Sequence, residues 1–204
     1  MKNVIFLRHA KLNPPFQDYE KLTFQDFSKL ARGETQPGIE LLSNDIMEQV
    51  IQKYKLENVQ EILSSPSLRA VMTARKLAET LQLTTIIKER RFLSEIYFDP
   101  DILTTERQFQ QEGLMAIRTQ IYQSSLSEGR GVESFASVLK RVNDLTRTIH
   151  ELSSENILCI THSFYMRVLI QILLEHKTPV NIRHEDLFNT VNYSYLEGFQ
   201  VYVN

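Results

Sequence analysis

Short, mostly apolar runs alternate along this chain with longer segments in which apolar residues recur at helical spacing. The short runs lie at residues 4–7, 61–64, 85–87 and 157–160. Consecutive apolar positions over such a length are typical of strands buried on both faces of a sheet. The pattern therefore predicts a central, mainly parallel sheet with helices packed on it.

The longer segments predict the helices. Helical spacing of apolar residues covers 38–55, 66–81 and 135–152, while residues 164–174 are apolar nearly all round and predict a buried helix. Ser65 is the expected N-cap of the second helix, with Pro66 at its first position, and Ser134 is the expected N-cap of the third. The charged residues of that third helix, Lys140, Arg141, Asp144 and Arg147, are expected on its solvated side without a function.

Two further regions are less regular. Residues 106–122 are rich in glutamine and have helical character, and residues 193–196 and 199–203 predict a terminal hairpin or edge pair. We therefore expect an α/β fold, a three-layer α/β/α sandwich with a mostly parallel sheet, formed by one domain over residues 1–204. Residues 11–36 are expected to form a lid and residues 97–131 an insertion that covers the cleft.

Composition limits the possible functions. The 204 residues carry a formal net charge of −2, so no basic field favours nucleic acid as the main partner. No apolar run approaches the roughly 20 residues that span a bilayer, and the N-terminus enters a strand without a secretory signal. The single cysteine, Cys159, lies within an apolar run and is expected to be a buried structural thiol. Cytoplasmic residence is the default expectation.

Candidate chemistry lies where two predicted strands end. The first strand ends at Arg8-His9, and the fourth ends at Thr161-His162-Ser163. Because ligands of α/β sheets bind outside the carboxyl ends of the strands, these residues are expected to meet at one edge. Arg69 follows the second strand in the first turn of a predicted helix, where free N–H groups already favour an anion.

Glu95 leaves two interpretations open. It lies between apolar residues in the segment Leu93-Ser94-Glu95-Ile96. It is either a half-exposed acid on a strand edge or a partly desolvated acid with a raised pKa.

Together these residues favour phosphoryl chemistry. A neutral imidazole can act as a nucleophile, and the arginines would hold a phosphoryl group and offset the charge on its oxygens. Metal-dependent hydrolysis lacks support, because no His-Glu-x-x-His motif, paired cysteine or close acidic cluster occurs in the sequence. The phosphate-binding glycine motifs and the serine-nucleophile elbow are also missing.

The ordered motifs resemble the histidine phosphatase superfamily, which includes the phosphoglycerate mutases. The similarity spans about residues 4–170 and rests on Leu7-Arg8-His9-Ala10, Ser64-Ser65-Pro66 with Arg69-Ala70 and Thr73-Ala74, Leu93-Ser94-Glu95, Glu133-Ser134, and Thr161-His162-Ser163 with Arg167. The resemblance implies that His9 is the phosphorylated nucleophile. It also implies that Arg8, Arg69 and His162 bind the phosphoryl group and that Glu95 donates a proton to the leaving oxygen.

The sequence departs from this family pattern at several positions. Ala10 and Ser163 replace common glycines, and Lys11 stands where an acid is frequent. Asn13 lies near the position of a phosphate-contacting asparagine but does not clearly match it, so that role is not transferred. Whether Lys11, Asn13 or Arg32 contacts the substrate is left open, as are the substrate and the oligomeric state.

The expected function is hydrolysis of a small-molecule phosphomonoester through phosphorylated His9, without metal or other cofactor. One alternative is a phosphoglycerate mutase, against which stand the short chain and the lack of a dense basic patch in residues 99–131. The other is a non-catalytic module on the same fold that binds a phosphorylated ligand or a protein.

Overall fold

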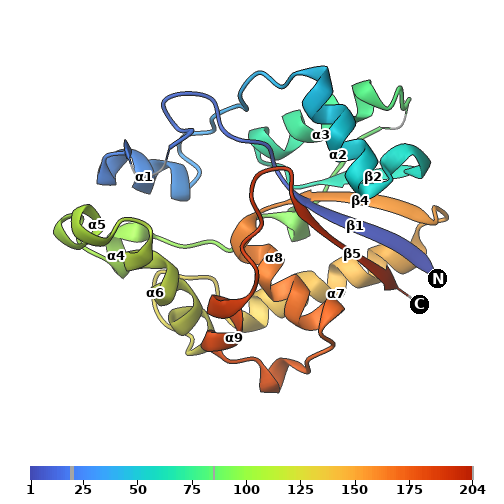
Figure 1. Cartoon of the computed structure of the whole chain (residues 1–204). Coiled ribbons are helices and arrows are strands. Elements are labelled where there is room, and N and C mark those ends of the chain that lie inside the picture. The colour runs from blue at the N-terminus through green and yellow to red at the C-terminus, as the bar shows by residue number, and fades with distance from the viewer. Residues whose placement is uncertain (19–20, 85, 204) are drawn as a thin grey trace.

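The centre of the molecule is a mixed five-stranded sheet (Figure 1). The computed structural model describes residues 1–18, 21–84 and 86–203. Four strands are parallel, in the order β3-β2-β4-β1, and β5 lies antiparallel beside β1. The strands are β1 (Lys2–Arg8), β2 (Glu61–Ser64), β3 (Lys88–Glu89), β4 (Asn156–Thr161) and β5 (Gly198–Val203).

The register of the parallel strands brings their ends to one level. Arg8, the last residue of β1, pairs with Thr161, the last residue of β4. Ser64 at the end of β2 pairs with Ile160. Residues that follow these three strands therefore emerge side by side at the carboxyl edge of the sheet.

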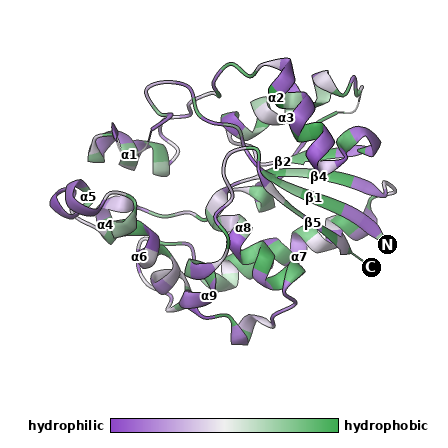
Figure 2. Cartoon of the chain, viewed as in Figure 1, coloured by the Kyte–Doolittle hydropathy of each residue, from purple (hydrophilic) through white to green (hydrophobic). Residues whose placement is uncertain are grey.

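Alternate residues of each strand feed two separate cores, as the period of two in a strand requires. On one face Val4, Phe6 and Cys159 join the core that contains α7 (Phe135–Glu151) and α8 (Ser163–Leu169). On the other face Ile5, Leu7 and Leu158 join α2 (Asn44–Tyr54) and α3 (Leu68–Thr80). The three-layer α/β/α sandwich is confirmed, and Figure 2 shows hydrophobic residues over most of β1 and β4.

A second group of helices lies beyond the carboxyl edge of the sheet (Figure 1). Ser28 Oγ donates a hydrogen bond to Asp101 Oδ1 at 2.8 Å, and Phe27 stacks on Phe109 with 5.0 Å between ring centroids. These contacts join segment 11–36 to segment 97–131. The group consists of α1 (Phe24–Ala31), α4 (Pro100–Leu103), α5 (Glu106–Glu112), α6 (Met115–Leu126) and α9 (His184–Asn189).

Short helical turns complete the fold. The predicted buried helix 164–174 is confirmed as helical, because α8 continues into a π-helical turn at Ile170–Leu174. The others are single 3₁₀ turns at Leu56–Asn58, Arg91–Leu93 and Pro179–Asn181.

Two helix starts differ from the predictions. The helix expected over 38–55 begins only at Asn44, because Ile39 pairs with Leu12 in an isolated antiparallel bridge and Ser43 caps the helix by accepting the Ile46 N–H. The helix expected to start at Pro66 begins at Leu68, with Ser67 in the N-cap position. The hydroxyl of Ser65 lies 2.8 Å from His162 Nε2 and also accepts the Ser67 N–H at 3.4 Å, so this serine links the site to the start of α3.

One strand prediction is wrong and another is only partly correct. The strand expected at 85–87 lies instead at Lys88–Glu89, and Ile86 is 80% exposed; Thr85 is outside the described residues. The predicted strand at 199–203 is confirmed as the edge strand β5, but residues 193–196 form no strand in the described chain and β5 pairs with β1. At the start of β5, a Cβ on Gly198 would lie 1.7 Å from the Phe6 carbonyl oxygen, so only glycine fits there.

Two expectations from composition can be compared with the structure. Within residues 1–18, 21–84 and 86–203, no helix is both long and apolar enough to cross a membrane. Cys159 is fully buried, and burial raises the pKa of its thiol far above the usual range, which confirms a structural role.

Candidate active site

The two histidines singled out in the sequence lie side by side. His9 directly follows β1, and His162 directly follows β4, the neighbouring parallel strand. Their ring centroids are 5.1 Å apart, with the planes inclined by 61°. Both side chains are almost fully buried, at 3% and 1% exposure. The sheet register alone accounts for their meeting.

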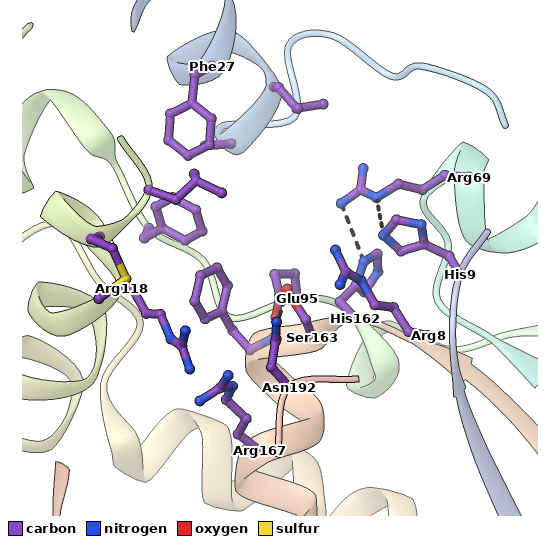
Figure 3. Close-up of a pocket in the computed structure, with 16 residues that line it drawn as sticks. Arg8, His9, Phe27, Arg69, Glu95, Arg118, His162, Ser163, Arg167 and Asn192 are labelled. Carbon is purple, nitrogen blue, oxygen red and sulfur yellow. Dashed lines mark hydrogen bonds between the residues drawn. The ribbon is translucent and has the colours of Figure 1, made fainter. Parts of the chain in front are cut away.

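Arg69 contacts both imidazoles from the first turn of α3 (Figure 3). Its Nε donates to His9 Nε2 at 3.2 Å, and its Nη2 lies 3.4 Å from His162 Nδ1. A guanidinium only donates hydrogen bonds, so each of these ring nitrogens must carry its lone pair.

The partners on the other side of each ring fix the tautomers. His9 Nδ1 lies 2.7 Å from the Ala10 carbonyl, which only accepts, so Nδ1 carries the hydrogen and Nε2 is the basic atom. His162 Nε2 lies 2.8 Å from Ser65 Oγ and therefore donates to that hydroxyl. His9 thus presents an unprotonated nitrogen toward the guanidinium.

The surroundings keep both histidines neutral. Burial lowers the pKa of His9 well below its usual value, and the charges of Arg69 and Arg8 lower it further, against an opposing effect of the Ala10 carbonyl. Burial and Arg69 lower the pKa of His162 in the same way. A neutral imidazole is the form that can act as a nucleophile.

Arg8 is held by a loop that the sequence interpretation missed. Its Nη1 donates to the Tyr193 carbonyl at 2.9 Å, and its guanidinium carbon lies 4.1 Å from the centre of the Tyr195 ring. Tyr195 also lies over His9, with 5.7 Å between centroids. The apolar and aromatic character of residues 193–196 suggested a strand, whereas an Arg–aromatic stack was not visible from spacing.

Glu95 is not part of a strand, and its carboxyl group lies against the first residues of α8. Its carboxyl oxygens accept the N–H groups of Ile96, Phe164 and Tyr165 at 3.0, 3.1 and 2.8 Å. These bonds favour the anion, but burial outweighs them and raises the pKa of Glu95 above its usual value. Of the two interpretations of Glu95 from the sequence, this environment favours the desolvated acid with a raised pKa.

The segment that carries Glu95 is anchored by Arg141, which was expected to be a solvated residue without a role. Arg141 Nη1 donates to the Ser94 carbonyl at 2.7 Å, while Nε and Nη2 form a two-pronged pair with Glu133 at 2.9 and 2.7 Å. Arg141 also lies 4.4 Å from the centre of the Tyr165 ring. The expectation was wrong because helical spacing cannot show that a neighbouring loop covers this face of α7.

A cavity of about 200 Å³ unites these groups. One end is lined by Arg8, His9, Arg69 and His162, with Glu95 beside them, and a second pair of cations, Arg118 and Arg167, lies across the cavity (Figure 3). Apolar side chains complete the wall, among them Phe27, Leu30, Phe98, Leu114, Met115 and Phe164. The site residues proposed from sequence all border this cavity.

The residues whose contact with the substrate was left open do not border this cavity. Lys11, Asn13 and Arg32 are not part of the cavity wall, and Arg32 pairs with Glu34 and Asp101. Ala10 is accommodated without a left-handed backbone, and its N–H donates to Thr73 Oγ1 at 2.9 Å. Within the described parts of the chain, no group of three or more His, Cys, Asp or Glu side chains could hold a metal ion.

The paired histidines and the arginines at the carboxyl edge of the sheet form a cationic site of a kind suited to an oxyanion. The comparisons define the class further: residues 5–197 match the model of the histidine phosphatase superfamily (branch 1), and the chain belongs to this family. The resemblance inferred from the motifs is thereby confirmed.

Solved structures share the fold of this chain. A mycobacterial glucosyl-3-phosphoglycerate phosphatase in complex with VO3 is 15% identical, with a TM-score of 0.65 over 98% of this chain and 92% of that chain. A phosphoserine phosphatase mutant from Entamoeba histolytica in complex with phosphoserine is 19% identical, with a TM-score of 0.57 over 98% and 90% of the two chains. None of the curated protein sequences is significantly similar to this chain.

Proposed function

We propose that the protein is a metal-independent phosphomonoesterase that forms a phosphohistidine at His9. The observation that carries this proposal is the unprotonated Nε2 of His9, which faces Arg69 beside the cavity. Membership of the histidine phosphatase superfamily is consistent with this chemistry.

In the first step, His9 Nε2 attacks the phosphorus atom of a bound phosphomonoester. The N–P bond forms, the P–O bond to the organic group breaks, and the proton of the Glu95 carboxyl passes to the leaving oxygen. In the second step, the Glu95 carboxylate takes a proton from water, whose oxygen attacks phosphorus. The N–P bond breaks, inorganic phosphate is released, and neutral His9 and the Glu95 carboxyl are restored.

The cations around His9 would hold the transferred group. The guanidiniums of Arg8 and Arg69 can bind its oxygens and offset their charge, since arginine offers a planar fork of donors. His162 now accepts from Arg69, so it can donate to the phosphoryl group only when protonated. A bound dianion favours that protonated form, because an opposite charge nearby raises the pKa of an imidazole.

The surrounding helices would set specificity. We infer one domain over residues 1–204, in which segments 11–36 and 97–131 act as lid and insertion. Phe27 and Leu30 of the first and Phe98 and Met115 of the second border the cavity, which fits a small organic phosphomonoester.

Trapping of the phosphoenzyme tests the mechanism. The protein is mixed with nitrophenyl phosphate labelled at phosphorus, in the presence of a chelator. It should retain the label after alkaline quenching and lose it in acid, as a phosphoramidate does. The His9→Ala variant should retain none, whereas exchange of the exposed His150 for alanine should leave labelling unchanged.

Other outcomes would contradict the proposal. An acid-stable, alkali-labile adduct would assign the nucleophile to a serine or an acid, and labelling lost to the chelator would require a metal. Interconversion of phosphoglycerates would make the protein a mutase, and phosphate binding without turnover would make it a binding module.

A further inference from the structure

A pair of arginines lies in the cavity across from His9 (Figure 3). Arg118 belongs to α6 and Arg167 to α8. Arg118 Nη2 and Arg167 Nη1 donate to the same acceptor, the carbonyl of Phe188, at 3.1 and 2.7 Å. Arg167 Nη1 also donates to the Leu187 carbonyl at 2.9 Å. Two positive charges are therefore brought together at one backbone oxygen near the end of α9.

These arginines retain donors that the fold does not use. Arg167 is only 1% exposed, yet its Nη2 has no hydrogen-bond partner among the described residues, and neither has Nε of Arg118. No described carboxylate forms an ion pair with either side chain. A buried guanidinium without a counter-ion costs considerable free energy, so the arrangement suits an anion that enters from the cavity.

The electrostatics agree with this interpretation. Burial lowers the pKa of Arg167, and the nearby charge of Arg118 lowers it too, while Tyr122 and Glu95 oppose the change. Tyr122, one of the two acids that act on Arg167, is buried and the pKa of its hydroxyl is raised, so it carries no charge; burial also raises the pKa of Glu95. Arg118 also lies 4.9 Å from the centre of the Phe188 ring, so a structural role explains its contacts with α9, but not the donors of Arg118 and Arg167 that have no partner.

Resting on the proposed phosphatase activity, we propose that Arg118 and Arg167 bind a second anionic group of the same substrate. The substrate would be a phosphomonoester with a carboxylate or a second phosphate at the far end of a short organic body. Its phosphoryl group would contact His9, and its body would pass the apolar wall formed by Phe98 and Phe164.

Matched substrates test this inference. Propyl phosphate has no second anionic group, 3-phosphooxypropanoate adds a carboxylate, and propanediol bisphosphate adds a second phosphate. Homologues with longer chains vary the distance between the two anionic groups. We expect kcat/KM to be higher for one or both of the substrates with a second anionic group than for propyl phosphate. The Arg118→Gln exchange should reduce that preference roughly tenfold to a hundredfold, as loss of a charge-assisted hydrogen bond implies.

Two further variants make the result specific. Arg118→Lys should restore part of the preference because it keeps the charge. Arg107→Gln, an exposed position on α5 outside the cavity wall, should leave it unchanged. The subsite would be overturned if Arg118→Gln kept the full preference for the second anionic group. It would also be overturned if the variant lost the same factor in kcat/KM for all three substrates.

Binding of non-hydrolysable phosphonates separates the two proposals. Calorimetry with propylphosphonate and 3-phosphonopropanoate measures the subsite even in the absence of turnover. If nitrophenyl phosphate is hydrolysed but carboxylate brings no gain in turnover or binding, the subsite fails and the phosphatase stands. If no phosphomonoester is hydrolysed but the carboxylated phosphonate binds more tightly through Arg118, the catalytic proposal fails and the anion subsite stands.

Discussion

At the residue scale, the site depends on hydrogen bonds whose direction is fixed. Arg69 can only donate and the Ala10 carbonyl can only accept, so His9 is left with one tautomer. Glu95 is subject to opposing influences, since three backbone N–H groups favour its anion and burial favours its acid. A carboxyl with a raised pKa can give a proton in one step and take one in the next.

The exchange Glu95→Gln tests this role by comparing leaving groups. General acid catalysis is typically worth about 10²–10⁴-fold, so the variant should lose about that much in single-turnover phosphorylation of His9 by an alkyl phosphate. Nitrophenolate leaves without a proton, so the first step with nitrophenyl phosphate should suffer much less. Rapid-quench kinetics of product release measure both rates. Equal losses for the two substrates would limit Glu95 to packing at the start of α8.

At the scale of elements, α7 and α8 hold the acid between them. Glu95 accepts N–H groups at the start of α8, and Arg141 of α7 fixes the preceding carbonyl of Ser94. The Arg141–Glu133 pair is largely buried, with 15% and 14% of the side chains exposed. We therefore expect Arg141 to act as a positioning residue for Glu95, although its charge also lowers the pKa of His162.

The exchange Arg141→Met should reduce both the stability of the protein and the contribution of Glu95 to the rate. Removing one partner of a mostly buried pair should lower the free energy of unfolding by about 1–3 kcal/mol in urea titrations. The rate with an alkyl phosphate should fall more than the rate with nitrophenyl phosphate, and Arg141→Lys should recover part of this ratio. Arg147→Met is the matched control, because Arg147 is 68% exposed on the same helix and should cost about 0.5 kcal/mol or less. An unchanged substrate ratio would make Arg141 purely structural.

Sequence patterns predicted those elements whose local signal agrees with their packing. The buried strands at 4–7 and 157–160 and the helix capped by Ser134 are correct, because their apolar periodicity matches the faces that they bury. Errors occurred where a side chain serves a distant partner. Ser65 resembles a helix cap but hydrogen-bonds His162, and Tyr195 resembles a strand residue but stacks on Arg8. Such partners are set by tertiary contacts, which spacing along the chain does not encode.

The same limit applies to the site as a whole. His9 and His162 were predicted to meet because strand ends in a parallel sheet meet. Arg167 was noted only as part of the family motif, and Arg118 lies in a less regular segment. Nothing in the sequence showed that both side chains would meet at α9.

At the scale of the whole molecule, the buried histidines couple the site to folding stability. Burial lowers the pKa of His9 and His162, so the native protein leaves both unprotonated where the unfolded chain, with ordinary values near 6.5, takes up protons. The unfolded state then binds more protons, and the free energy of unfolding must fall as pH drops below about 6.5. The stability that these groups contribute is present above that pH. Glu95 acts in the opposite direction, because its raised pKa costs stability as pH rises above its ordinary value of 4.5.

Urea titrations between about pH 7 and pH 5 should therefore show a decline of up to about 1.4 kcal/mol per pH unit for each buried histidine. The double exchange of His9 and His162 for glutamine should flatten this decline, whatever its effect on stability at neutral pH, because glutamine takes up no proton. Exchange of the exposed His150 for glutamine is the matched control and should leave the slope as it is. Glu95 is present in all three proteins, so its opposing effect cancels in the comparison. Equal slopes in the wild type and the double variant would show that the native site accepts protons as readily as the unfolded chain. The neutral nucleophile on which the proposed mechanism depends would then be lost at mildly acidic pH.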